Sequence, residues 1–417
     1  MAQIKDDCFA FGDNLMQLED ALAILIERVK PIMETEMVRT SSAISRILAE
    51  NILAPRDVPP CDNSAVDGYA VFFDDLNLKA KTRLPVKARV AAGHPLEGAA
   101  NHGEAIRIFT GAPMPVGMDT VYMEEDCEVV GPEVILPPGL KKGANRRLKG
   151  EDVKKNDLVI AAGKRLRPQE LGLAATIGRA ELRVFKPLKT AIFSTGDEVY
   201  DPIQEAPKGC IYDANRYTIM GLLHDLGCSV TDLGIISDNE DAIAKTLAKA
   251  TTGHDLILTS GGVSAGEEDH VKAAVTRDGT IHFWRLSIKP GRPIALGQVA
   301  RTPFIGLPGN PVAAMVTFMI IARPLILMLA GASDISATRF PVKAGFPYKK
   351  KLGRREWVRA KLRQCGDSLV AEKYSAGGSG ILRSMVFADG LIELSEEQID
   401  VNVGDVVNYL PFNEVSR

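Results

Sequence analysis

Residues 187 to 331 alternate short apolar runs with segments of helical periodicity, and this rhythm constrains the fold more than any other feature of the chain. Strands are expected at 190–193, 229–236 and 255–259, and helices at 215–226 and 240–250. Such alternation is typical of a parallel sheet with helices on both faces. Ligands bind these sheets beyond the carboxyl ends of the strands. The sequence therefore predicts a doubly wound, mostly parallel α/β domain over residues 186–333, with a site at that edge.

Further domains are expected on both sides of this one, because 417 residues exceed one ordinary core. Helical spacing at 17–30, 41–48 and 168–177 predicts an N-terminal mixed helical domain formed by residues 10–54 and 146–185. Short alternating runs, punctuated by Gly and Pro, predict an inserted β domain over residues 55–145. Short strands with many glycines predict a C-terminal β domain over residues 334–417.

Charge and cysteine usage exclude several classes of protein. The formal net charge is −3, whereas a domain that grips a nucleic-acid backbone usually carries a basic excess. The 6 cysteines form no CxxC pair, so a zinc ribbon or redox dithiol is not indicated, and scattered cysteines suit a reducing cytosol. The polar N-terminus lacks a signal peptide, and the apolar stretch 315–330 is interrupted by Arg323-Pro324. A cytoplasmic protein that binds neither nucleic acid nor membrane is expected.

A glycine-rich loop follows the strand at 255–259 and ends at Asp269. Glycines let backbone N–H groups approach an anion, and the serine hydroxyls add donors. Asp269 stands where it could hold Mg²⁺ or orient a nucleophile. The alternative is a plain strand-to-helix turn. The loop residues that we expect to bind a phosphorylated ligand are Ser260, Gly261, Gly262, Ser264 and Gly266.

Two later turns carry groups suited to anions. Arg285, Lys289 and Arg292 lie within eight residues of one another, in a segment stiffened by prolines. This pattern favours an anion clamp, with a solvated turn as the alternative. The run from Pro308 to Pro311 lies between a strand and a helix, and Asn310 is expected at the N-cap. A second phosphate or substrate contact at Pro308 and Asn310 is the sharper interpretation of this turn, and a capped helix start is the simpler one.

Acidic residues follow three of the predicted strands: Glu198, Asp238 and Asp269. Parallel strands place their carboxyl ends at one edge, so these acids are expected to converge and to suit a metal ion or a ribose. Asp67 and Thr110 lie in two polar turns of the inserted β domain, where an Asx turn is the alternative reading.

Six segments, taken together, resemble the molybdopterin molybdenumtransferase family, which also includes the C-terminal part of gephyrin. They occur in that family's order and span nearly the whole chain. The segments are residues 62–70, 110–113, 194–198, 260–269, 289–291 and 307–311.

The resemblance implies an enzyme that inserts molybdate into adenylylated molybdopterin, releases AMP and forms molybdenum cofactor in a reaction that needs Mg²⁺. It implies an elongated homodimer whose site lies between the subunits, in contact with molybdopterin adenylyltransferase and with molybdoenzyme chaperones. Motif matching assigns catalytic roles to Asp67, Thr110, Glu198, Asp238 and Asp269, of which Asp238 and Asp269 would lie around Mg²⁺.

The same matching assigns Lys289 to a phosphate or oxyanion, and Arg359 and Ser379 to the molybdate pocket. Arg285 and Arg292 stand where many relatives carry lysine, so a planar fork replaces a point charge there.

Two alternatives compete with this function. Molybdopterin adenylylation belongs to smaller proteins that resemble the central domain alone, and the additional N- and C-terminal regions argue against it. A non-catalytic scaffold of the same fold would normally carry appended interaction segments, and we find none in the sequence.

Overall fold

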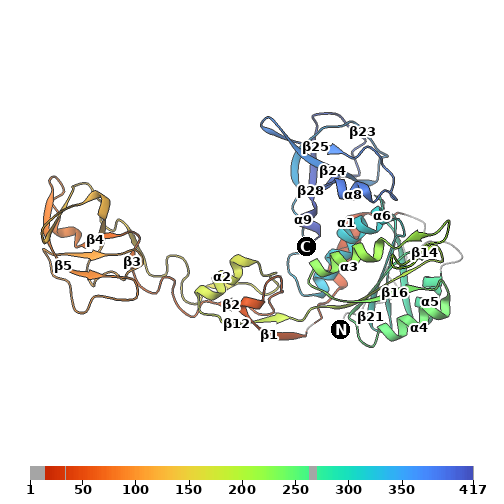
Figure 1. Ribbon diagram of the computed structural model, residues 1–417, viewed down its shortest axis with the longest axis horizontal. Helices are drawn as coiled ribbons and strands as arrows, with labels where there is room; N and C mark the ends of the chain where they lie inside the picture. Colours follow the sequence, from red (N-terminus) through yellow and green to blue (C-terminus); the bar gives the residue numbers. More distant parts are fainter. Residues whose placement is uncertain (1–14, 33, 263–269, 417) are drawn as a thin grey trace.

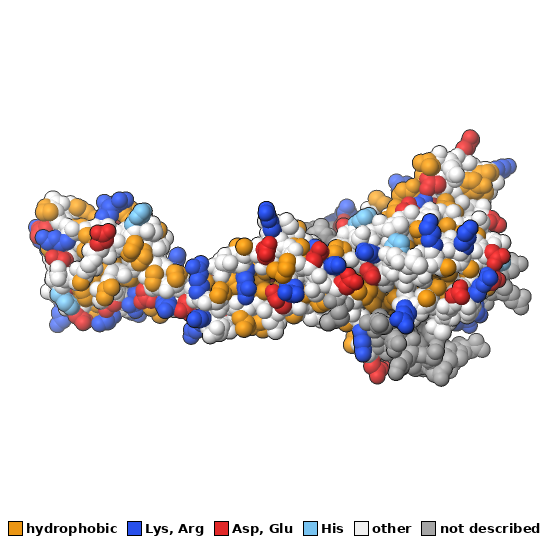
Figure 2. All heavy atoms as spheres, turned by 90° about the horizontal axis from the view of Figure 1, so that it is seen from below, with side chains coloured by type: hydrophobic (Ala, Val, Ile, Leu, Met, Phe, Trp, Pro, Cys, Tyr) orange, Lys and Arg blue, Asp and Glu red, His pale blue; other side chains and the backbone are white. Residues whose placement is uncertain are grey.

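The computed structural model describes residues 15–32, 34–262 and 270–416 of the chain. Its parts follow an elongated path, which two perpendicular views show (Figures 1 and 2). A distal β domain lies at one end, and a narrow middle domain joins it to a larger sheet domain. A C-terminal barrel stands on the sheet domain (Figure 1). Basic and acidic side chains are interspersed along the face shown in Figure 2.

The sheet domain is built on a mixed sheet with the strand order β16-β13-β17-β21-β20-β18. Its first four strands are parallel, and the last two add antiparallel at one edge. Its elements are β13 (Lys189–Thr195), β14 (Val199–Tyr200), β15 (Ile211–Tyr212), α3 (Asn215–Asp225), β16 (Ser229–Ile236), α4 (Glu240–Ala250), β17 (Leu256–Ser260), α5 (His270–Asp278), β18 (Gly279–Arg285), β19 (Ile288–Lys289), β20 (Pro293–Val299), β21 (Thr302–Leu307), α6 (Pro311–Thr317), η4 (Phe318–Ala322) and α7 (Arg323–Leu329).

Helices cover both faces of this sheet, as predicted for a doubly wound fold. Successive side chains of a strand point to opposite faces. On β13, Ala191 and Phe193 pack into the core that contains α4 and α5, whereas Ile192 packs into the core that contains α3 and α6. The alternation of apolar side chains therefore builds two separate cores and leaves the strand ends free for a ligand.

The most apolar stretch of the chain is a buried helix, and Arg323-Pro324 does not interrupt it. α6, η4 and α7 run without a break from Pro311 to Leu329, and 94% of the most apolar part is buried. The turn before the proline, η4, is a π-helix, and its wider spacing accommodates the missing N–H of Pro324. By length and composition this helix could cross a membrane, but it packs inside the sheet domain.

The first helix, α1 (Leu18–Arg28), packs on the sheet domain. Leu18, Ala21 and Leu25 join the same buried cluster as Ile192. The sequence prediction had grouped this helix with the N-terminal domain. The 3.6-residue spacing identifies a helix and its apolar face, but it does not say which surface that face covers.

The middle domain consists of antiparallel pairs from two distant stretches of chain, with the distal β domain inserted between them, as predicted. The helix expected at 41–48 is wrong, because Ile47 and Leu48 instead form bridges to Arg165 and Val184. Tertiary pairing overrides the local helical spacing here. The elements are β1 (Thr35–Arg39), η1 (Thr40–Ser42), β2 (Ile52–Leu53), β11 (Leu158–Ile160), α2 (Pro168–Thr176) and β12 (Glu181–Phe185).

The distal β domain has a sheet with the strand order β7-β4-β6-β5-β9-β8. Apolar clusters cover both faces of this sheet. Its elements are β3 (Asn63–Ser64), β4 (Gly68–Val71), η2 (Phe73–Asp75), β5 (Thr82–Val90), β6 (Ala105–Ile108), β7 (Thr120–Met123), η3 (Glu124–Asp126), β8 (Glu128–Val130), β9 (Glu133–Leu136) and β10 (Arg146–Arg147).

The C-terminal barrel closes because β24 and β26, the two end strands of the order β24-β25-β22-β28-β26, pair with each other. β19 of the sheet domain adds to it as a parallel neighbour of β24. One segment therefore belongs to both domains. The barrel elements are β22 (Phe340–Ala344), β23 (Tyr348–Lys349), β24 (Arg355–Cys365), β25 (Ser368–Lys373), α8 (Arg383–Phe387), β26 (Gly390–Leu394), β27 (Asp400–Val401), β28 (Val406–Pro411) and α9 (Phe412–Val415).

Candidate active site

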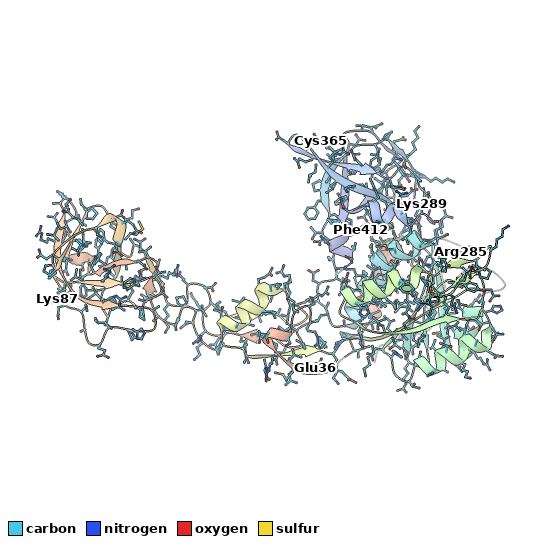
Figure 3. All side chains as sticks on the ribbon, in the orientation of Figure 1. Glu36, Lys87, Arg285, Lys289, Cys365 and Phe412 are labelled. Atoms are coloured by element: carbon cyan, nitrogen blue, oxygen red, sulfur yellow. The ribbon has the colours of Figure 1, made fainter. Side chains whose placement is uncertain are left out.

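A cavity of about 730 Å³ lies where the carboxyl ends of the parallel strands face the C-terminal barrel. It gathers many of the residues selected from the sequence, and Figure 3 shows Lys289 at the junction of the two domains. The predicted residues that line the cavity are Glu198, Asp238, Gly261, Gly262, Lys289, Arg292, Pro308, Asn310, Arg359 and Ser379.

The first two glycines of the glycine-rich loop form one wall of the cavity. Both have positive φ, +88° at Gly261 and +64° at Gly262. A Cβ at Gly261 would lie 2.8 Å from the carbonyl oxygen of Thr195, and one at Gly262 would lie 2.6 Å from a methyl of Val271. Only glycine fits this turn. Ser264, Gly266 and Asp269 lie outside the described residues.

Ser260 holds the two loops together. Asn215 Nδ2 donates to Ser260 Oγ at 2.7 Å and to the Gly309 carbonyl oxygen at 2.7 Å. The Ser260 hydroxyl donates to the carbonyl oxygen of Pro308 at 3.3 Å. Its proton is therefore engaged within the protein, and Ser260 is not among the residues that line the main cavity. Asn215, which the sequence prediction missed, links the glycine loop to the Pro308–Pro311 turn.

The Pro308–Pro311 turn leads into α6, with Pro311 at the first helical position, as expected. Asn310 occupies the N-cap position, but its side chain makes no capping hydrogen bond. The amide of Asn310 is exposed and lines the cavity. The turn is also tied to the barrel, because Val312 N donates to the carbonyl oxygen of Ser379 at 3.0 Å.

Lys289 and Arg292 flank a turn that requires glycine. Gly291 has φ +96°, and a Cβ there would lie 2.1 Å from Thr317 Oγ1. Lys289 Nζ donates to Glu356 Oε2 at 3.2 Å and to Tyr348 Oη at 3.3 Å. Arg292 is exposed and makes no ion pair with any described residue. Both cations line the cavity, and Arg292 carries its charge there without a carboxylate partner among the described residues, which suits an anion.

The barrel contributes a buried arginine to the same cavity. Arg359 Nε donates to Ser384 Oγ at 3.0 Å, and Nη2 donates to the carbonyl oxygens of Ala376 at 3.3 Å and Gly378 at 3.2 Å. Burial lowers the pKa of this guanidinium, and no carboxylate of the described residues pairs with it. Lys373 also lines the cavity and has no ion pair within the described part of the chain. A buried guanidinium without a carboxylate partner, such as that of Arg359, favours a bound anion.

The acidic residues lie on the sheet side of the cavity. Thr195 Oγ1, at the end of β13, donates to Asp238 Oδ1 at 3.2 Å. Glu198 lies three residues beyond Thr195 and lines the same cavity. Within residues 15–32, 34–262 and 270–416, no three His, Cys, Asp or Glu side chains form a group that could hold a metal ion. The strand-end argument thus brings Glu198 and Asp238 to one cavity, and Asp269 is beyond what the structure describes.

A buried charge network supports the loop between Glu198 and α3. Arg216 Nε donates to Asp213 Oδ2 at 2.9 Å, and the guanidinium also contacts the carboxylates of Asp201 and Asp232. Burial lowers the pKa of Arg216, but the hydrogen bonds to these aspartates outweigh it and raise the pKa overall. The loop is therefore fixed by charge pairs beneath it.

Asp67 and Thr110 lie away from this cavity, in the distal β domain (Figure 1). The backbone N–H and the hydroxyl of Thr110 each donate to Asp67 Oδ1 at 2.7 Å. These two hydrogen bonds lower the pKa of Asp67. These two predicted residues thus hydrogen-bond to each other, but within one chain they do not join the other site residues.

Arg285 is exposed at the end of β18 and does not line the cavity, although Lys289 follows it closely in sequence (Figure 3). The sequence prediction missed Tyr348, Glu356 and Lys373, which reach the site region from the barrel. Such residues carry no local motif, because they reach the site through long-range contacts between the barrel and the sheet domain, among them the pairing of β19 with β24.

Comparisons with known proteins agree with this architecture. Family models match three consecutive parts of the chain: the MoeA N-terminal region (domain I and II) over residues 16–178, a probable molybdopterin binding domain over residues 191–328, and the MoeA C-terminal region (domain IV) over residues 341–412.

Whole-length relatives share this arrangement. A molybdopterin molybdenumtransferase of Haemophilus influenzae is 38% identical over 405 residues, which cover 96% of this chain and 100% of that protein. Molybdopterin molybdenumtransferase 2 of Mycobacterium tuberculosis is 30% identical and covers 94% of this chain and 97% of its own length. The solved structure of a molybdopterin biosynthesis MoeA protein from Pyrococcus horikoshii OT3 matches with a TM-score of 0.82 at 28% identity, over 95% of this chain and 100% of that one.

Proposed function

The chain belongs to the molybdopterin molybdenumtransferase family, and from this premise we propose that it inserts molybdate into adenylylated molybdopterin, releases AMP and yields molybdenum cofactor. The observation that carries the proposal is the single cavity in which a glycine loop and two acids face a set of cations. Both substrates are anions, and one cavity with two chemically different sides suits a reaction between them.

The cationic side is the proposed molybdate pocket. Lys289, Arg292 and Arg359 line it, with Ser379 beside them. A dianion that leaves water loses its hydration, and positive charges and hydrogen-bond donors of the protein must replace it. The guanidinium of Arg359, anchored by two carbonyl oxygens and a hydroxyl, offers its remaining N–H groups at a fixed place. Preorganised donors of this kind stabilise charge without a cost of reorganisation.

The sheet side is the proposed nucleotide end. Gly261 and Gly262 allow backbone to approach the phosphoanhydride closely. Mg²⁺ is usually held by one or two carboxylates together with substrate phosphates. Asp238 and Glu198 fit that donor set, and Asp269 would add to it. When bound, Mg²⁺ would offset charge on the phosphate oxygens as AMP leaves.

We also propose that the protein works as a cytoplasmic homodimer. Asp67 and Thr110 form a hydrogen-bonded pair in the distal β domain, which lies away from the sheet domain and the barrel (Figure 1). An elongated subunit paired with a second copy can bring this pair to the partner's cavity. Contacts with molybdopterin adenylyltransferase and with molybdoenzyme chaperones would deliver the substrate and receive the product.

Molybdopterin adenylylation is the second candidate. It would need only the sheet domain, and the cavity disfavours it, because Arg359, Lys373 and Ser379 come from the barrel. A scaffold without catalysis is disfavoured by the intact acids and cations of the cavity.

The test mixes the purified protein with adenylylated molybdopterin and Mg²⁺, with molybdate or with sulfate as a control dianion. We expect AMP release with molybdate and little with sulfate. AMP release at the same rate with and without molybdate would refute the proposal, and so would the absence of AMP release under every condition.

Mixing two inactive variants tests the shared site. If Asp67→Asn and Arg359→Gln subunits exchange at equal amounts, the mixture should recover about a quarter of the wild-type rate, because half of the dimers carry one intact site. No recovery after proven exchange would argue against a site shared between subunits.

A further inference from the structure

Glu356 is a buried carboxylate directly behind Lys289. Its side chain is 1% exposed, and it does not line the cavity. Oε2 accepts hydrogen bonds from Tyr348 Oη at 2.8 Å and from Lys289 Nζ at 3.2 Å. Oε1 accepts from Arg354 Nε at 3.0 Å, and Arg354 Nη2 also contacts it. Both carboxylate oxygens are therefore fully engaged, and none of these contacts is available to a substrate.

The backbone places this carboxylate opposite Lys289. β19 and β24 pair in parallel with Lys289 in register with Glu356. The Arg355 amide donates to the Ser287 carbonyl oxygen at 2.9 Å, which fixes the two strands just before this position. The contact between Lys289 and Glu356 thus follows from strand pairing and does not depend on the choice of side-chain rotamers alone.

The ammonium of Lys289 is shared between the protein and the cavity. An ammonium has three donors. Glu356 and Tyr348 take two of them, and the half-exposed side chain lines the cavity. Nζ lies 5.9 Å from the centroid of the Tyr348 ring. One N–H therefore remains for a ligand, while the other two fix the position of the nitrogen.

Glu356 remains charged in this setting. Burial alone would raise the pKa of its carboxyl, but hydrogen bonds from Arg354, Tyr348 and Lys289 outweigh burial and lower the pKa. A buried carboxylate with four donors is an acceptor of fixed geometry, since no donor can be dropped without leaving a polar group unsatisfied.

We propose that Glu356 is a positioning residue for the reaction: it holds the ammonium of Lys289 and the hydroxyl of Tyr348 at the cavity wall, so that Lys289 meets the oxyanion from one fixed position. The proposal rests on the function proposed above and adds to it a residue that no substrate touches. The proposal assigns two separate roles to Lys289. Its charge binds the anion, and its fixed position supports the rate of the reaction.

Glu356→Gln separates charge from placement. Glutamine has the same shape, but one of its two acceptors becomes an NH₂ group. If its oxygen faces Arg354, the NH₂ faces two other donors, and Lys289 loses its anchor. The cavity then keeps its cation, and even gains net positive charge, while the nitrogen is no longer held. We expect kcat to fall by about tenfold or more, because misplacement of a reacting-site group by about 1 Å can cost that much. KM for molybdate should rise less than about twofold.

Three further variants complete the design. Glu356→Asp keeps the charge with a shorter reach and should give an intermediate kcat. Glu393→Gln is the matched control, because Glu393 is also a buried barrel carboxylate, paired with Arg339 and Arg355, and it does not line the cavity. It should lose stability without a change in kcat. Lys289→Gln should raise KM for molybdate, since it removes the charge itself.

A second readout needs no turnover. The rate at which a small acylating reagent acetylates Lys289, measured by peptide mass spectrometry, should rise several-fold in Glu356→Gln and stay at the wild-type value in Glu393→Gln. If wild-type protein released no AMP with molybdate, the function proposed above would fail, and this readout would still decide the role of Glu356. A wild-type acetylation rate in Glu356→Gln, or a kcat no lower than that of Glu393→Gln, overturns the proposal.

Discussion

Replacing Arg216 by methionine should destabilise the sheet domain strongly. The Arg216 side chain is 3% exposed and contacts three aspartates, of which Asp213 is 2% exposed. Methionine fills much of the same space without the charge. The carboxylate of Asp213 would then remain buried without its cation, and the loop that follows Glu198 would lose its support.

The loss in free energy of unfolding follows from the burial of the side chains involved. Removing one partner of a buried pair costs about 3 to 5 kcal/mol. The Asp201 and Asp232 side chains are 22% and 38% exposed, so water recovers part of their loss. We therefore expect about 3 kcal/mol, the lower end of that range. For a unit of about 150–250 residues this corresponds to a Tm lower by roughly 6 to 12 °C.

Calorimetry at neutral and acid pH tests this value. The Ile203 amide donates to Asp201 and, together with Arg216, lowers the pKa of that carboxyl. A carboxyl whose folded pKa is lowered stabilises the fold above its unfolded pKa, and this contribution is lost as the pH falls through the folded pKa. The gap in Tm between wild type and variant should therefore be largest at neutral pH and should narrow as the pH falls below about 4.

The control is Arg277→Met. Arg277 pairs with Asp241, but the two side chains are 53% and 86% exposed, so its removal should not measurably change Tm. Equal Tm values for Arg216→Met and Arg277→Met at neutral pH would contradict this prediction, and so would a Tm difference between wild type and Arg216→Met that stays constant in acid.

Three further substitutions test the cavity walls. Asn215→Ala removes two hydrogen bonds between the glycine loop and the neighbouring turn, and it should lower kcat/KM for AMP release by roughly tenfold, which is about 1.4 kcal/mol. Gly291→Ala forces a Cβ into Thr317 at φ +96° and should abolish molybdate-dependent AMP release, whereas Gly172→Ala, where a Cβ meets nothing within 4 Å, should behave as wild type. Arg359→Lys keeps the charge but cannot reach both carbonyl oxygens and the serine, so steady-state kinetics should show kcat/KM lower by about tenfold or more.

Local patterns predicted the sheet domain well, because its strands and helices are each set by short-range periodicity. β16 and α4 coincide with the predicted strand and helix at 229–236 and 240–250. The rule that ligands bind at strand ends also predicted that Glu198 and Asp238 would lie together, and both line the same cavity. Where each domain begins and ends stays a prediction.

The remaining features of the fold and of the site could not be predicted from local patterns, because they depend on long-range packing. Nothing in the spacing of α1 says that it covers the sheet domain, and nothing near Ile47 shows that it pairs with Arg165. Asn215 and Glu356 act through partners that are distant in sequence, so they carry no motif. Contacts of this kind appear only once the topology is known.

The shared strand β19 has a consequence for dividing the protein into fragments. A fragment that starts at the predicted boundary of the C-terminal domain would lack β19, and Arg355 and Glu356 at the start of β24 would have no neighbour on that side. Unpaired strand edges invite association with other chains. A fragment that stops before the barrel would leave Lys289 on a strand without a partner. The barrel and the sheet domain should therefore express well only when they remain in one polypeptide.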